Sequence, residues 1–283
     1  MTPNFEVKVL LDPKTAITTP PNFPPQPVED LLKTFNLTAP NFNMAVQFLD
    51  TDKTKVIYTA GWSPRIRRMD EDPKKIELTY KKRYSIPLPS TITTFNADPA
   101  TDISIYQTAI DQVLVLAASD GFDASETGYD AQIEWGYQKL TLSISKKKKE
   151  KAADWNLGTD ASILPDEKSS RGMLVEEAPG KFKNWDGVPD WGTDAVKESR
   201  IYGPVHAYRW EGKWDGEDID VEIWPIKGKE EGEGMELIGE VSFKTEDAVV
   251  AKERQGRLIE VLKEGGWFLE GDSLKTQLIM DRY

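Results

Sequence analysis

The chain has 283 residues, enough for one large domain with its own core, and it contains no cysteine and a single histidine, His206. The missing cysteines exclude disulfides, thiolate nucleophiles and zinc–thiolate sites, and one histidine excludes any site that needs a histidine cluster. With 48 acidic and 36 basic residues, the formal net charge of −12 disfavours general binding to nucleic acid or to an anionic membrane. Any catalysis is therefore expected to use carboxylates, basic side chains and metal ions.

The amino-terminal segment does not look like a targeting signal. Its only apolar stretch is interrupted by Glu6 and Lys8, which is not the composition of a signal-peptide core. The best apolar run, residues 113–118, is far shorter than the roughly 18 residues of a membrane span. The sequence therefore predicts a cytoplasmic protein without a membrane partner, and it leaves the oligomeric state open.

Alternation of apolar and polar residues dominates the chain and predicts ten β-strands. They are expected at residues 4–11, 45–50, 55–60, 64–69, 75–84, 131–135, 139–145, 205–210, 218–224 and 237–244. Helical spacing appears at residues 28–36, 102–118 and 246–264, and a short helix is expected from Ser273. The clearest of these helices is 246–264, with Thr245 as its N-cap and Gly265 as its stop. We expect a single α+β domain over residues 1–283.

Two polar segments lack periodicity. Residues 146–200 are rich in Gly, Pro, Asp, Lys and Trp and predict an irregular insertion, either an ordered cap or a partly mobile segment. Their first residues, KKKKEK, lack the aromatic residues of a nucleic-acid patch, follow the strand expected at 139–145 and are expected to be a solvated strand end. Residues 227–234, KGKEEGEG, lack the Gly-Lys-Ser/Thr ending of a phosphate loop and predict a polar hairpin connection.

Charged residues gather on one face of each predicted strand, because successive side chains point to opposite faces. Arg65 and Arg67, for example, oppose Ile66, and His206 falls on the opposite face from Arg209. A sheet with one face in water would explain any single strand. The whole set, together with helices that need an apolar surface to cover, indicates charged faces that meet inside a closed barrel with the helices outside. Because dry burial of many charges is costly, such a barrel would be a wet tunnel suited to a polyanion and its metal.

Several short motifs follow one another along these strands. They are Asn4-Phe5-Glu6-Val7-Lys8, Phe48-Leu49-Asp50-Thr51, Arg65-Ile66-Arg67, Leu78-Thr79-Tyr80-Lys81, Arg209, Ile219-Asp220-Val221 and Gly239-Glu240-Val241-Ser242-Phe243. In this order they resemble the CYTH superfamily, the triphosphate tunnel metalloenzymes. The resemblance extends over about 240 residues, and it leaves the Pro-rich connector at 20–27 and the segment 146–200 unmatched.

The resemblance implies a closed antiparallel eight-stranded β-barrel in which basic side chains hold a triphosphate and carboxylates hold Mg²⁺ or Mn²⁺. The phosphate-binding residues that it implies are Lys8, Arg65, Arg67, Lys81, Arg209 and Lys244. The metal ligands that it implies are Glu6, Asp220, Glu222 and Glu240, and the implied catalytic residues are Glu6, Glu240 and Lys81. The residue types suit this chemistry, because arginine forks match phosphate oxygens and hard divalent cations prefer carboxylate oxygens. The expected partner is a small phosphorylated substrate, and no nucleic acid is expected.

Two positions depart from the family pattern. Asn4 stands where the opening motif has its first Glu, and Ser242 stands where the late Glu-x-Glu motif has its second. Losing two carboxylates weakens divalent-ion binding, whereas the basic half of the pattern is intact. A changed function would leave this combination, and so would drift within an active hydrolase.

Three functions therefore stay open. The first is a divalent-metal-dependent hydrolase of inorganic or organic triphosphate. The second is a diphosphate-ester lyase or cyclase, for example acting on an isoprenyl diphosphate, with aromatic residues that stabilise a cation. Its aromatic candidates are Trp62, Trp135, Trp210, Trp214, Trp224 and Trp267, although core and helix packing is the favoured explanation for them. The third is a non-catalytic phosphate-binding module, expected if Asn4 and Ser242 abolish metal affinity.

Overall fold

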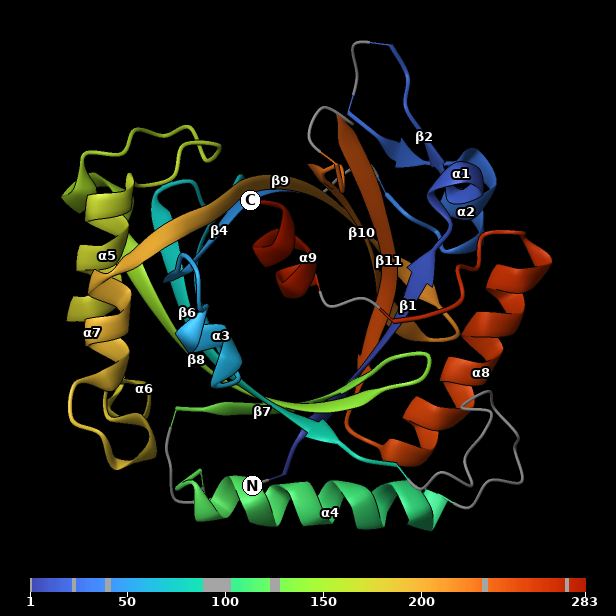
Figure 1. Ribbon diagram of the computed structural model, residues 1–283. Coiled ribbons are helices and arrows are strands. Elements are labelled where there is room, and N and C mark those ends of the chain that lie inside the picture. The colour runs from blue at the N-terminus through green and yellow to red at the C-terminus, as the bar shows by residue number, and fades with distance from the viewer. Residues whose placement is uncertain are drawn as a thin grey trace.

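A computed structural model describes residues 2–21, 24–38, 42–88, 103–122, 128–230, 234–272 and 275–283. Within these ranges nine strands close into one barrel, and Figure 1 shows most helices around its outside, with the last helix inside the ring of strands. The barrel strands are β1 (Asn4–Leu11), β4 (Phe42–Thr51), β5 (Trp62–Met69), β6 (Lys75–Ile86), β7 (Asp130–Trp135), β8 (Leu140–Lys151), β9 (Ser199–Trp214), β10 (Glu217–Lys227) and β11 (Met235–Thr245). A separate small sheet pairs β2 (Ile17–Thr18) with β3 (Gln26–Pro27).

The helices account for much of the remaining described chain. They are α1 (Pro13–Ala16), α2 (Glu29–Thr34), α3 (Val56–Thr59), α4 (Ile103–Ser119), α5 (Glu167–Glu176), α6 (Gly180–Lys183), α7 (Trp191–Lys197), α8 (Ala248–Glu264) and α9 (Lys275–Arg282), with 3₁₀ turns at Ala152–Trp155 and Trp185–Gly187. No helix in the described part of the chain is long and apolar enough to cross a membrane. The expected helix starts at Asp102 and Ser273 fall outside the described residues.

The barrel has nine strands rather than the predicted eight, and it is not wholly antiparallel. Around the ring the order is β1, β11, β10, β9, β4, β5, β6, β8 and β7, and β7 closes on β1 in parallel. An odd number of strands cannot alternate in direction all the way around a closed ring, so at least one neighbouring pair must be parallel. The parallel pair joins Asn4 to Gln132 and Val7 to Trp135. The predicted closed barrel is confirmed, and the predicted strand count and uniform pairing are wrong.

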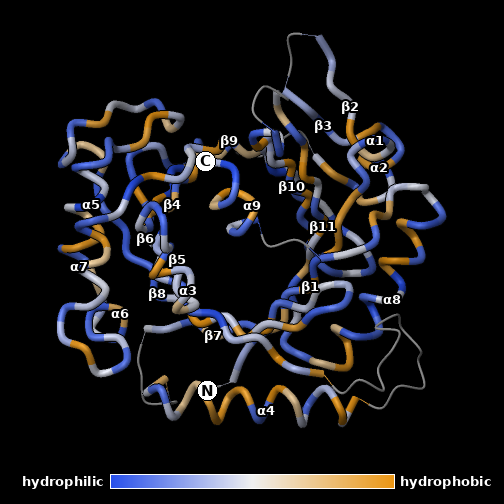
Figure 2. Tube along the Cα trace, in the orientation of Figure 1, coloured by the Kyte–Doolittle hydropathy of each residue, from blue (hydrophilic) through white to orange (hydrophobic). Residues whose placement is uncertain are grey.

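The apolar faces of most strands point outward, as the alternation predicted. Val7, Ile66 and Leu78 are fully buried in the main core between the barrel and its surrounding helices. Figure 2 shows the same contrast along the chain, with hydrophobic and hydrophilic positions interleaved on the strands. Burying these faces under α4 and α8 leaves the charged faces directed into the lumen.

The N-cap of α8 is Asp247 and not the predicted Thr245. Thr245 is the last residue of β11 and pairs with Phe5 of β1, so it is part of the barrel wall. The side chain of Asp247 instead accepts hydrogen bonds from the backbone N–H groups of Val249 and Val250, at 2.7 and 3.1 Å. The helix can begin only after the chain has left the strand, and Asp247 is the first capping residue beyond it.

The strand predicted at 55–60 is a helical turn, α3. The buried carboxylate of Asp50, near the end of β4, accepts hydrogen bonds from the backbone N–H groups of Ile57 and Tyr58, at 3.0 and 2.7 Å. The hydroxyl of Thr51 accepts a further bond from Val56 N–H. These side chains satisfy the first donors of the turn, so capping overrides the β propensity of Val56 and Ile57.

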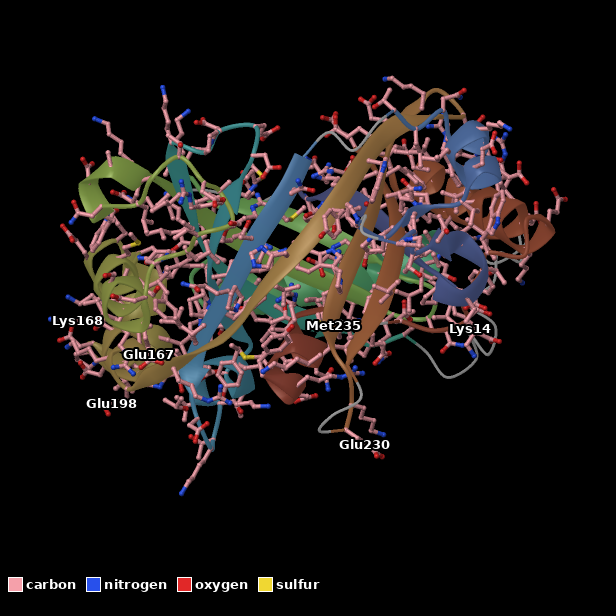
Figure 3. The ribbon with its side chains drawn as sticks, turned by 90° about the horizontal axis from the view of Figure 1, so that it is seen from above. Lys14, Glu167, Lys168, Glu198, Glu230 and Met235 are labelled. Atoms are coloured by element: carbon pink, nitrogen blue, oxygen red, sulfur yellow. The ribbon has the colours of Figure 1, made fainter. Side chains whose placement is uncertain are left out.

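The segment 146–200 continues β8 and then forms helices α5, α6 and α7 at the side of the barrel (Figure 1). Its KKKKEK run is the solvated end of β8, as predicted, although the strand extends farther than residue 145, because the run pairs with β6 as far as Lys151 opposite Lys75. Beyond it, Arg68 anchors the chain to the outer barrel wall. This side chain is 1% exposed and donates to the carbonyls of Ile163 and Gly158, both at 2.7 Å. Seen from above, Glu167 and Glu198 of this segment lie on the opposite side of the barrel from Lys14 (Figure 3).

Two further predictions are confirmed at the surface. The segment after β10 is a hairpin connection to β11, closed by a backbone hydrogen bond from Gly228 to Gly234, although residues 231–233 lie outside the described ranges. His206 is exposed, on the outer face of β9. Neither feature takes part in the lumen.

Candidate active site

All ten of the predicted site residues line one cavity inside the barrel, with a volume of about 210 Å³. The side chains of Arg65, Arg67 and Lys81 are 22, 16 and 14% exposed, so they face the lumen and not bulk solvent. The strand faces therefore converge as the alternation predicted.

The cavity carries an excess of positive charge although the whole chain is acidic. Among the described residues nine basic side chains and five carboxylates line it, a surplus of four positive charges. The basic residues are Lys8, Arg65, Arg67, Lys81, Arg83, Lys147, Arg209, Lys244 and Lys275. The carboxylates are Glu6, Glu134, Asp220, Glu222 and Glu240. The local field thus has the opposite sign to the net charge of −12.

Strands β5 and β6 supply the basic side of the lumen. Pairing of Arg65 with Thr79 aligns the two strands so that alternate residues of both face inward. Arg67 donates to Glu77 at 2.7 Å, whereas Arg65 has only a long contact with Glu77, at 3.9 Å. Among the described residues, the buried Nε atoms of Arg65, Arg67 and Arg83 have no hydrogen-bond partner. Buried donors without partners are costly, so this side of the lumen is built to receive acceptor atoms.

Burial and neighbouring charges shift the pKa values of basic residues on this side of the lumen. Burial, and then the neighbouring Arg67, lower the pKa of Arg65 to about 10. Burial also lowers the pKa of Lys81 to about 7; Glu134 opposes this effect, and Arg83 and Lys8 reinforce it. In both cases burial is the main cause, and neighbouring cations add to it.

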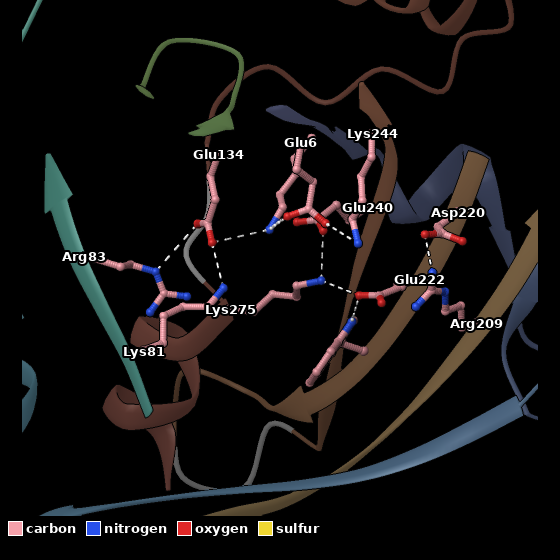
Figure 4. Close-up of polar contacts among 12 residues, drawn as sticks. Glu6, Lys81, Arg83, Glu134, Arg209, Asp220, Glu222, Glu240, Lys244 and Lys275 are labelled. Carbon is pink, nitrogen blue, oxygen red and sulfur yellow. Dashed lines mark hydrogen bonds and ion pairs between the residues drawn. The ribbon is translucent and has the colours of Figure 1, made fainter. Parts of the chain in front are cut away.

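Glu134 of β7 is a lumen residue that the motifs did not indicate. Its carboxylate contacts Lys81 at 2.9 Å, Arg83 at 3.6 Å and Lys8 at 3.9 Å (Figure 4). Although burial raises it, these three cations hold the pKa of Glu134 well below its usual range. Alternation within β7 places Gln132 and Glu134 on one face, so the signal was present in the sequence, as it was for Arg83 on the face of Lys81.

Strands β1, β10 and β11 supply the acidic side, on which each predicted metal ligand has a basic partner. Glu6 contacts Lys8 at 2.8 Å, and Asp220 accepts a hydrogen bond from Arg209. In the described part of the chain, no group of three acidic or histidine side chains is arranged to hold one metal ion. The four predicted ligands therefore share the cavity without forming a single cluster.

Glu222 and Glu240 form a pair of carboxylates joined by a common cation. They lie directly opposite each other on β10 and β11. Lys275, from the start of α9, contacts Glu222 at 2.5 Å and Glu240 at 2.9 Å (Figure 4). Burial alone would raise the pKa of Glu222 and lower that of Lys275, but their attraction reverses both shifts. No periodicity in the sequence could have placed Lys275 here, because its position depends on how α9 docks.

The two departures from the family pattern fall in different places. Ser242 lines the cavity and is 7% exposed, so a hydroxyl stands where the family pattern has a carboxylate. Asn4 is exposed at the first position of β1 and is not among the residues that line the cavity. Of the two, Ser242 is the change that bears on the lumen.

The aromatic residues lie mostly outside the lumen. Trp62, Trp135, Trp210 and Trp267 are buried in the outer core, with Trp214 packed against it. Only Trp224, among the described tryptophans, lines the cavity. The volume of about 210 Å³ is also below the roughly 300–1,000 Å³ typical of pockets for drug-sized ligands. Both observations argue against the isoprenyl diphosphate reading.

Comparison with known proteins finds only distant similarities. No protein-family model and no curated protein matches the chain. A candidate adenylyl cyclase from Hippeastrum, described as having a dominant triphosphatase activity, is similar at 17% identity and a TM-score of 0.49, over 97% of this chain and 93% of that one. Candidate adenylate cyclases from Bacillus halodurans and Vibrio parahaemolyticus are similar at 11 and 10% identity, with TM-scores of 0.44 and 0.39, over 98% of both chains in each case.

These likenesses are too distant to decide an activity. The structure confirms the closed barrel, because the motif strands close into a ring with their charged faces inside. Function has to be argued from the side chains of that lumen.

Proposed function

We propose that this protein hydrolyses a small triphosphate, inorganic or compactly substituted, inside the barrel with the help of Mg²⁺ or Mn²⁺. The observation that supports it is the surplus of four positive charges in a small enclosed cavity of an otherwise acidic chain. A linear triphosphate carries several negative charges and many acceptor oxygens, which would neutralise this surplus.

The basic side of the lumen would bind the phosphate chain. Among the described residues, Arg65, Arg67 and Arg83 have buried Nε donors without hydrogen-bond partners, and guanidinium groups suit phosphate oxygens. Lys8, Arg209 and Lys244 would bind at the edges of the same chain. Glu134 would not touch substrate, but it fixes the positions of Lys81, Arg83 and Lys8. The cavity favours a compact substrate because of its volume.

The divalent ion fits one pair of carboxylates best. Glu222 and Glu240 already share a cation, the ammonium of Lys275, and Mg²⁺ is commonly bound through one or two carboxylates together with phosphate oxygens. When bound, the ion would neutralise charge on the phosphate oxygens. We assign Glu6 and Asp220 to the surroundings of this position and not to the pair itself.

Hydrolysis would cleave a bond between phosphorus and a bridging oxygen. A water molecule would attack the terminal phosphorus while the bond to the bridging oxygen breaks. The protons of the water would stay on the inorganic phosphate that forms, and the shortened chain would leave with the bridging oxygen. Glu6 and Glu240 would orient the water. Lys81, protonated in the presence of the anion, would donate a proton to the leaving oxygen, and its pKa of about 7 suits that role near neutral pH.

Phosphate release from tripolyphosphate with Mg²⁺ or Mn²⁺ tests the proposal. We expect turnover that is abolished by Arg67→Ala and by Glu240→Gln, with the surface variant Arg257→Ala as a control that keeps full activity. Absence of release from any triphosphate would overturn the hydrolase proposal. Calorimetric binding without turnover would then indicate a phosphate-binding module.

A further inference from the structure

Lys275 brings a positive charge into the lumen from the carboxyl-terminal helix. Its ammonium contacts Glu222 at 2.5 Å and Glu240 at 2.9 Å, and the side chain is 18% exposed. The indole N–H of Trp224 donates to the same oxygen of Glu222 at 2.9 Å, and the ammonium lies 4.7 Å from the centre of the indole ring. Lys275 therefore has three partners on the lumen wall.

Docking of α9 determines where this ammonium lies. Ile279 and Met280 of the helix are buried in a second apolar cluster, against inward-facing residues that include Val205 and Trp224. Farther along the helix, Asp281 contacts Lys55 at 2.9 Å. A helix held at both its apolar face and its end keeps Lys275 at the carboxylates without requiring a ligand.

The position of the ammonium coincides with the position that a divalent ion would take. Both would lie between the same oxygens of Glu222 and Glu240, which face each other across β10 and β11. Two cations cannot share these oxygens, because like charges a few ångströms apart in a partly buried site repel strongly.

We infer that Lys275 is a built-in cation that competes with the divalent ion for Glu222 and Glu240, so that metal binds only when this ammonium leaves the pair. The inference rests on the proposed function, since it names how metal binding at that site is controlled. Lys275 is in this sense a residue that sets metal affinity, and it takes no part in bond cleavage.

Mn²⁺ binding without substrate tests this competition. We expect Lys275→Gln to bind Mn²⁺ at least about tenfold more tightly than the original chain, measured by calorimetry and by the Mn²⁺ spin-resonance signal. The thermal midpoint of Lys275→Gln should fall without metal and recover with Mn²⁺, because a ligand that binds only the folded state stabilises it. Lys275→Arg, which keeps the charge, should bind Mn²⁺ as weakly as the original chain.

Lys55→Gln is the matched control. It removes another lysine that contacts a carboxylate, loosens the far end of α9, and leaves Glu222 and Glu240 untouched. An increase in Mn²⁺ affinity in this variant equal to that of Lys275→Gln would overturn the inference, because loosening of the helix would then explain both. Unchanged Mn²⁺ affinity in folded Lys275→Gln would overturn it as well.

Failure of the inference can be separated from failure of the proposed function. Tripolyphosphate turnover by the original chain, with no gain of Mn²⁺ affinity in Lys275→Gln, would remove the competition and keep the hydrolase. A gain of Mn²⁺ affinity in a chain that hydrolyses no triphosphate would keep the competition and remove the hydrolase.

Discussion

The two sides of the lumen differ in how far their charged side chains are paired with opposite charges from the protein. On the β5–β6 side, Arg65 and its basic neighbours have few counter-charges, and three buried guanidinium Nε atoms lack hydrogen-bond partners within the described residues. On the β10–β11 side, Asp220, Glu222 and Glu240 each contact a basic side chain from the protein. One side is left open to a ligand, and the other is already neutralised.

The difference indicates which ligand the fold is prepared for. An anion entering the basic side meets guanidinium donors that are held in place before it arrives. A cation entering the acidic side has to displace a protein ammonium. The lumen is thus preorganised to bind polyphosphate. It would bind a metal ion only after the ammonium of Lys275 has left the carboxylates.

Removing Glu134 should have the largest effect, because it is the main counter-charge of the basic side. We expect Glu134→Gln to lower the free energy of unfolding by about 3 kcal/mol, since Lys8, Lys81 and Arg83 lose their shared carboxylate. Urea denaturation measures this change, and added tripolyphosphate should restore part of it. Asp218→Asn is the control, with a side chain 85% exposed. Comparable losses in both variants would contradict the special role of Glu134.

Removing a basic side chain that has few counter-charges should weaken anion binding. We expect Arg65→Ala to bind tripolyphosphate with about 2–3 kcal/mol less free energy, roughly 30- to 150-fold weaker, because charge-assisted hydrogen bonds are lost. Calorimetry measures the affinity. Arg257→Ala makes the same change of net charge on α8, outside the lumen, and should leave the affinity unchanged. A similar loss in Arg257→Ala would mean that overall charge, and not the basic side of the lumen, controls binding.

The low pKa of Lys81 predicts proton uptake when an anion binds. With a pKa of about 7, well below the usual lysine value, most Lys81 side chains are neutral at about pH 8. Bound phosphate favours the protonated form and raises this pKa, so binding should take up close to one proton at about pH 8 and almost none at about pH 6. Calorimetry in buffers of different ionisation enthalpy counts these protons. Uptake that persists unchanged in Lys81→Met would assign it to another group.

Substitution of Lys244 should have the smallest effect on tripolyphosphate binding. Its side chain is 61% exposed and lies 3.9 Å from Glu6, so solvent screens its charge. We expect Lys244→Ala to weaken tripolyphosphate binding by about two- to threefold, under 1 kcal/mol. A loss as large as that of Arg65→Ala, in the same calorimetric measurement, would show that the binding site extends to this end of the barrel.

Strand alternation was sufficient to predict the charged interior. Arg65, Arg67 and Lys81 could be placed in one lumen because the direction of a side chain on a strand follows from its position alone. Glu134 carried the same signal and was missed because no motif drew attention to β7. The helical turn at α3 could not be predicted in this way, because the carboxylate of Asp50 overrides the local propensity of the following residues.

The sequence by itself determined which residues face inward and that the lumen would be rich in basic groups, since both follow from local periodicity and residue type. Only the tertiary structure decided how the ring closes, through the parallel pairing of β1 with β7, and which charges meet across it. Lys275 reaches Glu222 and Glu240 from 53 and 35 residues away in the chain. Contacts of this kind depend on how α9 packs into the barrel, and packing is a property of the assembled surfaces that no single segment contains.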